Sequence, residues 1–339
     1  MFAAVGYASV QAKVRARRSR ALDDAAWRRL IEASSWDRTL DVLATTPYLA
    51  VAHDPVRTER TLRQRVYRET IELADDVPRR GAELLRWYAG RFRVHDLKLW
   101  IRALHHGRPA TEALDGTTLD VEDDPRVAAW TKARSVPELV AAVGDTLYGR
   151  ALTTALERYQ SENRPFYLEV ALDLAFGRGL VTRIEVLGGH DAADAERLLG
   201  RWLARENLLA AARYRMLAGI RPEQVVAFTL HKAFGGGLAA IQRIAAGGDL
   251  AAEAAAVGLE LPPDLTGEAA IRAFERRADL VRREDAEARF GRGPFGLGLP
   301  LAYLIELEAE VDDLVTVLEA KLQGLPPEDL AERIPREVS

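Results

Sequence analysis

The feature that most constrains this chain is a helix ending that occurs three times, about one third of the sequence apart. The three segments are HDLKLWIRALHHGRPATEAL at 95–114, ENLLAAARYRMLAGIRPEQV at 206–225 and DDLVTVLEAKLQGLPPEDL at 312–330. The glycines in them are 112 and 105 positions apart, close to one third of the 339-residue length. The aligned positions are Asp96, Arg102, Gly107 and Pro109; Asn207, Arg213, Gly219 and Pro222; and Asp313, Lys321, Gly324 and Pro327.

Each residue type in this pattern suits a corner between two helices. Glycine ends a helix because it adopts the left-handed conformation after the cap without steric cost. Basic residues in the last turn favour the negative end of the helix dipole. Proline opens the next helix because the N–H that it lacks would be unpaired there. The pattern therefore predicts three structural corners rather than a reactive site.

A second pair of segments supports the same period. SWDRTLDVLATTPY at 35–48 aligns without gaps to SVPELVAAVGDTLY at 135–148, and a fainter third copy lies at 249–260. Composition shifts at the acidic loop 114–126 and at the glycine-rich stretch 232–238 mark the linkers. We therefore predict three related helical domains, at 1–115, 116–228 and 229–339.

Hydrophobic residues recur at helical spacing along most of the chain. Between 304 and 322 they step by three or four residues, with Glu308, Asp312 and Glu319 off the stripe. The best candidate for a strand, LVTRIEVLGG at 180–189, lacks clean alternation and is interpreted as helix or loop. The predicted fold class is all-α.

Composition excludes several classes of protein. There is no cysteine, which removes disulfides, thiolate nucleophiles and cysteine-ligated metals. The net charge is −4, whereas a domain that binds duplex nucleic acid normally carries a basic face. No stretch approaches the roughly 18 apolar residues of a membrane span. We expect a cytoplasmic protein that binds no nucleic acid.

The motifs that resemble ligand sites are weak. GRGPFG at 291–296 matches the spacing G-x-G-x-x-G, but a helical segment precedes it, a proline lies inside it, and the next helix is expected only after Pro300. KAFGGGL at 232–238 lacks the Gly-Lys-Ser/Thr ending of a phosphate-binding loop, and no histidine pattern indicates a metal. We predict no catalytic residue, no cofactor, no metal and no small-molecule substrate.

Two groups of charges are candidates for protein contacts. The basic group is Arg15, Arg17, Arg18 and Arg20, and the acidic group is Glu306, Glu310 and Asp313. Such groups commonly form solvated helix faces, and both interpretations stay open at this point.

Long segments resemble a known family. They are GPFGLGLPLAYLIELEAEVDDLVTVLEAKLQGLPPEDLAERI at 293–334, YASVQAKVRARRSRAL at 7–22 and the middle corner at 206–225. They look like the C-subunit family of V/A-type ATPases, whose eukaryotic relatives are known as the d subunit. The sequence departs from that family at Asp96 and Asp313, where asparagine is frequent, and at Glu319, where a basic residue is usual.

The resemblance implies three similar helical domains arranged as a funnel about a pseudo-threefold axis. It implies a non-catalytic socket, one copy per complex, that joins the central shaft subunits to the membrane proteolipid ring and transmits torque for ATP-coupled ion transport. It also implies a place on the cytoplasmic face of the membrane. Two alternatives are a helical-repeat adaptor that binds a soluble partner helix and an enzyme that uses the turn at 291–296.

Overall fold

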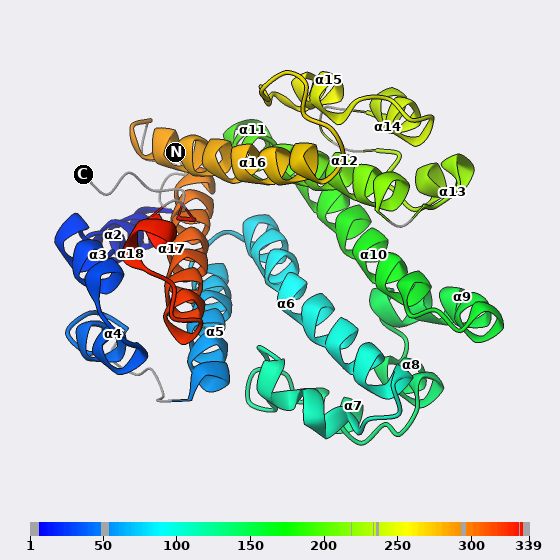
Figure 1. The fold of residues 1–339 in the computed structure, drawn as a ribbon, viewed down its shortest axis with the longest axis horizontal. Helices are drawn as coiled ribbons and strands as arrows, with labels where there is room; N and C mark the ends of the chain where they lie inside the picture. Colours follow the sequence, from blue (N-terminus) through cyan, green and yellow to red (C-terminus); the bar gives the residue numbers. More distant parts are fainter. Residues whose placement is uncertain are drawn as a thin grey trace.

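The computed structural model describes residues 7–48, 54–217, 219–232, 234, 237–292, 296–331 and 333–334. Every regular element in these ranges is helical, which confirms the all-α prediction (Figure 1). The strand candidate at 180–189 is the end of a helix followed by a loop, as interpreted from its poor alternation. No helix in the described ranges is long and apolar enough to cross a membrane.

The helices are grouped into three successive series along the chain, each of which includes one of the glycine corners. The first contains α2 (Ala8–Arg18), α3 (Asp24–Glu32), α4 (Trp36–Leu43), α5 (Pro55–Asp75), α6 (Arg79–His105) and the 3₁₀ helix η1 (Ala110–Gly116). The second contains α7 (Val127–Trp130), α8 (Val136–Val143), α9 (Leu147–Glu162), α10 (Phe166–Glu185), α11 (Gly189–Ala195), the π turn η2 (Glu196–Gly200), α12 (Arg201–Met216) and α13 (Pro222–Ala227). The third contains α14 (Leu238–Ala245), α15 (Leu250–Ala254), the 3₁₀ turn η3 (Ala255–Val257), α16 (Gly267–Phe290), α17 (Gly298–Leu322) and α18 (Pro327–Ala331).

The long helices contact one another in a closed order. Helix α5 packs on α6, α6 on α10, α12 on α16, α16 on α17, and α17 returns to α5, while α10 contacts η2 at the start of α12. Helix α18, near the C-terminus, packs on α3, so the first and last described helices lie on the same side of the molecule (Figure 1). Buried apolar side chains form one large cluster around α5, α6, α10 and α17 and a smaller one around α12 and α14–α16.

The short helices α4, α8 and α15 begin in the same way. The side chains of Ser35, Ser135 and Asp249 each accept a hydrogen bond from a backbone N–H in the first turn of the following helix. Tyr48 and Tyr148, which match in the sequence, are both buried, at 3% and 4% exposed. The aligned segments 35–48 and 135–148 therefore share a cap and a buried anchor.

The three glycine corners have the backbone that the pattern requires. Gly107, Gly219 and Gly324 have φ values of 69°, 60° and 68°, in the left-handed region. At the first and third corners the N–H after the glycine donates to a carbonyl five residues earlier, at 2.9 and 3.0 Å, as in a Schellman motif. At the second corner the carbonyl is six residues earlier, at 2.9 Å.

Proline was expected to open the helix after each glycine corner, and it does so at two of the three corners. Pro222 and Pro327 are the first residues of α13 and α18, whereas Pro109 precedes η1 as its N-cap. Helix α17 begins at Gly298, so Pro300 lies inside its first turn and does not mark its start. Proline is tolerated there because the first N–H groups of a helix have no intrahelical partner. Residues 293–295 of the glycine motif lie outside the described ranges.

Replacing Gly324 with valine is expected to lower the free energy of unfolding by about 1–3 kcal/mol. A Cβ at Gly324 would meet nothing within 4 Å, so the cost arises from backbone strain at φ +68° and not from a clash. Gly188→Val is the matched control, because Gly188 also has open space but an ordinary φ of −130°. Denaturant titration of both variants measures the difference, and equal midpoints would contradict the strain argument.

Candidate functional site

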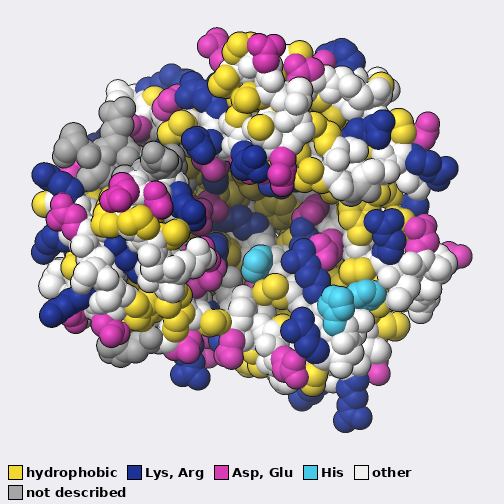
Figure 2. Space-filling view, in the orientation of Figure 1, with side chains coloured by type: hydrophobic (Ala, Val, Ile, Leu, Met, Phe, Trp, Pro, Cys, Tyr) yellow, Lys and Arg dark blue, Asp and Glu magenta, His cyan; other side chains and the backbone are white. Residues whose placement is uncertain are grey.

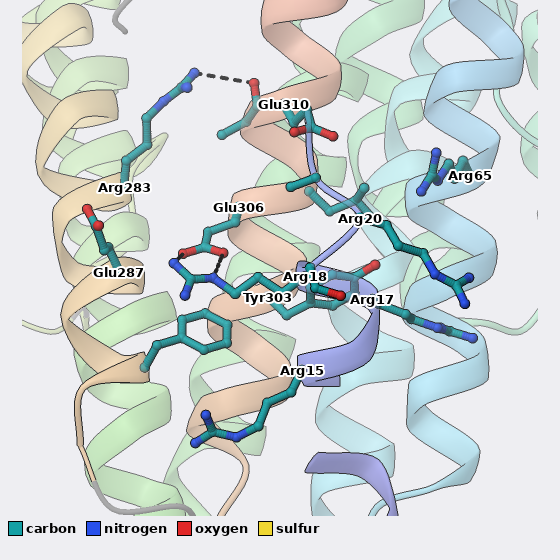
Figure 3. A pocket seen from close by; sticks show the side chains of 15 residues that line it. Arg15, Arg17, Arg18, Arg20, Arg65, Arg283, Glu287, Tyr303, Glu306 and Glu310 are labelled. Atoms are coloured by element: carbon teal, nitrogen blue, oxygen red, sulfur yellow. Dashed lines mark hydrogen bonds and ion pairs between the residues drawn. The ribbon is translucent and has the colours of Figure 1, made fainter. Parts of the chain in front are cut away.

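The predicted basic group and two members of the acidic group line one pocket of about 630 Å³ between α2, α5, α16 and α17, here called the arginine pocket (Figure 3). Its charged lining comes from four helices and the turn after α2, so the fold brings together residues nearly 300 positions apart. Those residues are Arg15, Arg17, Arg18, Arg20, Arg65, Arg283, Glu287, Glu306 and Glu310. Asp313 is not among the residues that line the pocket.

Several of these charges neutralise one another within the chain. Arg18 donates from Nε and Nη2 to the two carboxylate oxygens of Glu306, at 2.7 and 3.0 Å, and its guanidinium lies 3.9 Å from the centre of the Phe290 ring (Figure 3). Arg17 donates to Glu72 at 2.6 Å and lies 3.4 Å from Glu69. Such bidentate and networked pairs fix α2 against α5 and α17.

Two of the predicted contact residues belong to the interior. Glu310 is 5% exposed, and its carboxylate accepts hydrogen bonds from the N–H of Leu22 and the hydroxyl of Tyr48. Asp313 is 2% exposed and receives two hydrogen bonds from Arg283, at 2.7 and 2.8 Å. Their interpretation as surface contacts is therefore corrected, because these two side chains face the interior, where α17 packs against neighbouring helices.

Arg15 and Arg20 differ from the rest of the basic group. Both side chains are exposed, and neither has an ion pair among the described residues. They lie at the wall of the arginine pocket (Figure 3), where Glu287 is also exposed. They are the accessible part of the charged group that the sequence singled out.

The first two corners carry a side chain that binds the backbone 22 or 23 residues further on. The carboxylate oxygens of Asp96 accept the N–H groups of Thr118 and Leu119, both at 2.8 Å. The amide of Asn207 accepts the N–H of Leu230 at 2.7 Å and donates to its carbonyl at 2.9 Å. The corresponding partner of Asp313 would fall near residue 336, outside the described ranges.

Burial raises the pKa of Asp96 to about 7, although the two backbone N–H groups and nearby arginines oppose the change. An ionised carboxylate is therefore costly at this position. A neutral amide, as at Asn207, fulfils the same role without a charge.

Each basic corner residue reaches across to a helix of another series. Arg102 of α6 makes two hydrogen bonds of 2.7 Å to Glu169 of α10, and Arg213 of α12 pairs with Glu275 of α16. Lys321 donates to the carbonyl of Ile31 at the end of α3. The corner side chains thus link neighbouring series, a role beyond the helix-dipole effect expected from the sequence.

A largely buried ionic cluster joins three of the long helices around Glu308 of α17, here called the Glu308 cluster. The carboxylate accepts hydrogen bonds from Tyr88 at 2.7 Å, Arg91 at 3.1 Å and Arg282 at 2.8 Å. The side chains of Arg91, Arg282 and Glu308 are 12%, 14% and 18% exposed. Arg282 also lies 5.1 Å from the ring centre of Trp202, which brings α12 into the cluster.

Burial alone would raise the pKa of Glu308, but Arg91 and Arg282 with their hydrogen bonds outweigh it and hold the pKa below its usual range. The carboxylate therefore stays ionised and keeps the two arginines neutralised.

In space-filling view the molecule is hollowed near its centre, and charged side chains of both signs surround the hollow (Figure 2).

Comparisons with known proteins identify the family. The model of the ATP synthase (C/AC39) subunit family matches residues 10–333 of this chain. The chain belongs to the ATP synthase (C/AC39) subunit family. As a member, it is a subunit of a rotary ATPase.

Individual relatives agree with this family. The chain is 24% identical to the C subunit of the A-type ATP synthase of Methanocaldococcus jannaschii, over 96% of this chain and 85% of that protein. It is 26% identical to the C subunit of the A-type ATP synthase of Haloferax volcanii, over 94% of both chains. The family resemblance inferred from the corner and terminal segments is thereby confirmed.

Sequence reasoning missed the residues that hold this C/AC39 family member together at its centre. Glu308 seemed an ordinary polar position off the apolar stripe, and Arg91 and Arg282 drew no attention, since they lie 217 and 26 positions from it. The spacing of residues along the sequence does not reveal a cluster whose members lie on different helices. Within the described residues no group of three or more His, Asp or Glu side chains is placed to hold a metal ion.

Proposed function

We propose that this chain is the non-catalytic central-stalk subunit of a V/A-type ATPase. One copy per complex, on the cytoplasmic face of the membrane, would join the central shaft subunits to the proteolipid ring and transmit torque between them. The relatives named as C subunits of A-type ATP synthases support this assignment. The chain would act through binding and stiffness alone.

The observation that carries the proposal is the closed order of the long helices. A connector under torque must resist shear between its parts, and a closed series has no free edge at which two helices can slide apart. Ion pairs reinforce its seams at Arg102–Glu169, at Arg213–Glu275 and in the Glu308 cluster. This arrangement supports three domains, at 1–115, 116–228 and 229–339, placed as a funnel about a pseudo-threefold axis.

Docking of the neighbouring subunits requires charged surfaces that fix register. We propose that Arg15 and Arg20, which are exposed beside the arginine pocket, contact an acidic surface of one neighbour. Contacts of this kind steer association more than they add affinity, and salt screens them. Docking should therefore weaken as ionic strength rises.

Reconstitution without this subunit is the test. The catalytic sector is expected to continue hydrolysing ATP while ion pumping into vesicles disappears, because the shaft would no longer be attached to the ring. Adding back the purified chain should restore pumping. Pumping that persists without the chain, or ATP turnover by the isolated chain, would overturn the proposal.

A further inference from the structure

A second pocket, of about 460 Å³, lies between α6, α10 and α12. Its apolar wall is aromatic and only half buried: Phe166 makes edge contacts with Tyr214 and Phe228, with ring centres 5.3 and 5.5 Å apart. Trp202 and Leu174 extend this wall. The pocket shares Arg91 with the Glu308 cluster, so it adjoins the centre of the closed helix order.

The charges that line this pocket are almost all neutralised within the chain. Five of the six acidic, lysine and arginine side chains in its wall have an ion pair: Arg91 with Glu308, Lys98 with Asp173, Glu169 with Arg102, and Arg213 with Glu275. Glu206 of α12 is the exception, with no ion-pair partner among the described residues.

Glu206 is exposed to solvent at the wall of the pocket. Partial desolvation by the surrounding protein raises the pKa of its carboxyl, against the opposing effect of Arg282 and Arg213. A bound segment that covered Glu206 without a cation would leave a desolvated carboxylate unpaired, which is costly. An acidic segment would add repulsion.

We propose that the pocket between α6, α10 and α12 receives one amphipathic helix of a central-shaft subunit, whose apolar face lies on the aromatic wall and whose lysine or arginine pairs with Glu206. This inference rests on the proposed function and specifies the chemistry of the partner. An amphipathic helix commonly binds by laying its apolar face into a hydrophobic groove, such as the one that this aromatic wall forms between three helices. Aromatic faces also suit the methylene stem and the cation of a basic side chain.

Charge reversal at Glu206 tests the pairing. The probe is the purified shaft subunits of the same ATPase, titrated against the full chain by calorimetry at low salt. Glu206→Gln is expected to weaken binding about tenfold and Glu206→Lys more. Glu196→Lys is the matched control, since Glu196 lies in η2 just before α12, is exposed, has no ion pair among the described residues and is not part of the pocket wall. Thermal melting of each variant shows whether it is folded.

Thiol protection tests the location independently. The chain has no cysteine, so Ala210→Cys places a single thiol in the pocket wall and Ser161→Cys places one on the exposed side of α9. Shaft binding should slow maleimide labelling at position 210 at least tenfold and leave position 161 unchanged. If the wild-type chain binds the shaft but Glu206→Lys binds equally well, or position 210 stays reactive, the inference is wrong. If the wild-type chain does not bind the shaft, the proposed function itself fails.

Discussion

Replacing Glu308 with alanine is expected to lower the free energy of unfolding by about 3–5 kcal/mol, the cost of leaving buried charges without their partner. The substitution removes the acceptor of three hydrogen bonds at once and leaves Arg91 and Arg282 facing each other across the site. Denaturant titration near neutral pH measures the loss. The reason for so large an effect is that guanidinium groups cannot release their protons to avoid the repulsion.

Asp312→Ala is the matched control for Glu308→Ala. Asp312 lies one helical turn further along α17, but its side chain is 51% exposed and 3.5 Å from Arg63. Surface pairs of this kind contribute about 0–1 kcal/mol. If both variants unfolded at the same denaturant concentration, the Glu308 cluster would have no special role in stability.

Replacing Gly179 with alanine is expected to destabilise the protein by about 2–3 kcal/mol, although alanine normally favours a helix by about 1 kcal/mol over glycine. A Cβ at Gly179 would overlap the indole carbons of Trp87, where α10 packs on α6. Trp87 cannot easily move away. Its N–H donates to the carbonyl of Phe176 at 2.9 Å, and its ring stacks on Tyr148 with centres 5.4 Å apart.

A double-mutant cycle isolates this contact. In a Trp87→Ala background the obstacle is gone, so Gly179→Ala should become neutral or stabilising, and the two substitutions should be strongly non-additive. Thermal and denaturant unfolding of the four proteins provides the measurement. Additive effects would show that the clash with Trp87 does not determine the cost.

Local features of the fold could be read from the sequence because their causes lie within a few residues. Gly107, Gly219 and Gly324 have left-handed backbones because the helices before them must end. Ser35 and Ser135 cap their helices because a short oxygen-bearing side chain precedes an apolar run. In the fainter third copy of this segment, at 249–260, Asp249 caps the helix in place of serine, so the capping role is the same although the residue type differs.

The paired charges could not be predicted because each partner lies far away along the chain. Glu310 is buried by Leu22 and Tyr48, which are 288 and 262 positions from it. An acidic stripe at helical spacing has the same pattern on a solvated face and on a face enclosed by other helices. The arginine pocket was therefore foreseen only as two separate groups of charges, and the pocket around Glu206 was not foreseen at all.

The dependence of the N-terminal helices on α17 has a consequence for biosynthesis. Trp27 and Val14 are fully buried, and contacts that fix their helices come from Glu306, Glu310 and Lys321. The ribosome releases α2, α3 and α4 long before α17, so these first helices have part of their apolar surface uncovered for most of translation. Closing a loop of nearly 300 residues is slow compared with forming a local corner. The nascent chain is thus expected to be a chaperone client until its last third emerges, and only completed chains would be available for assembly into the ATPase.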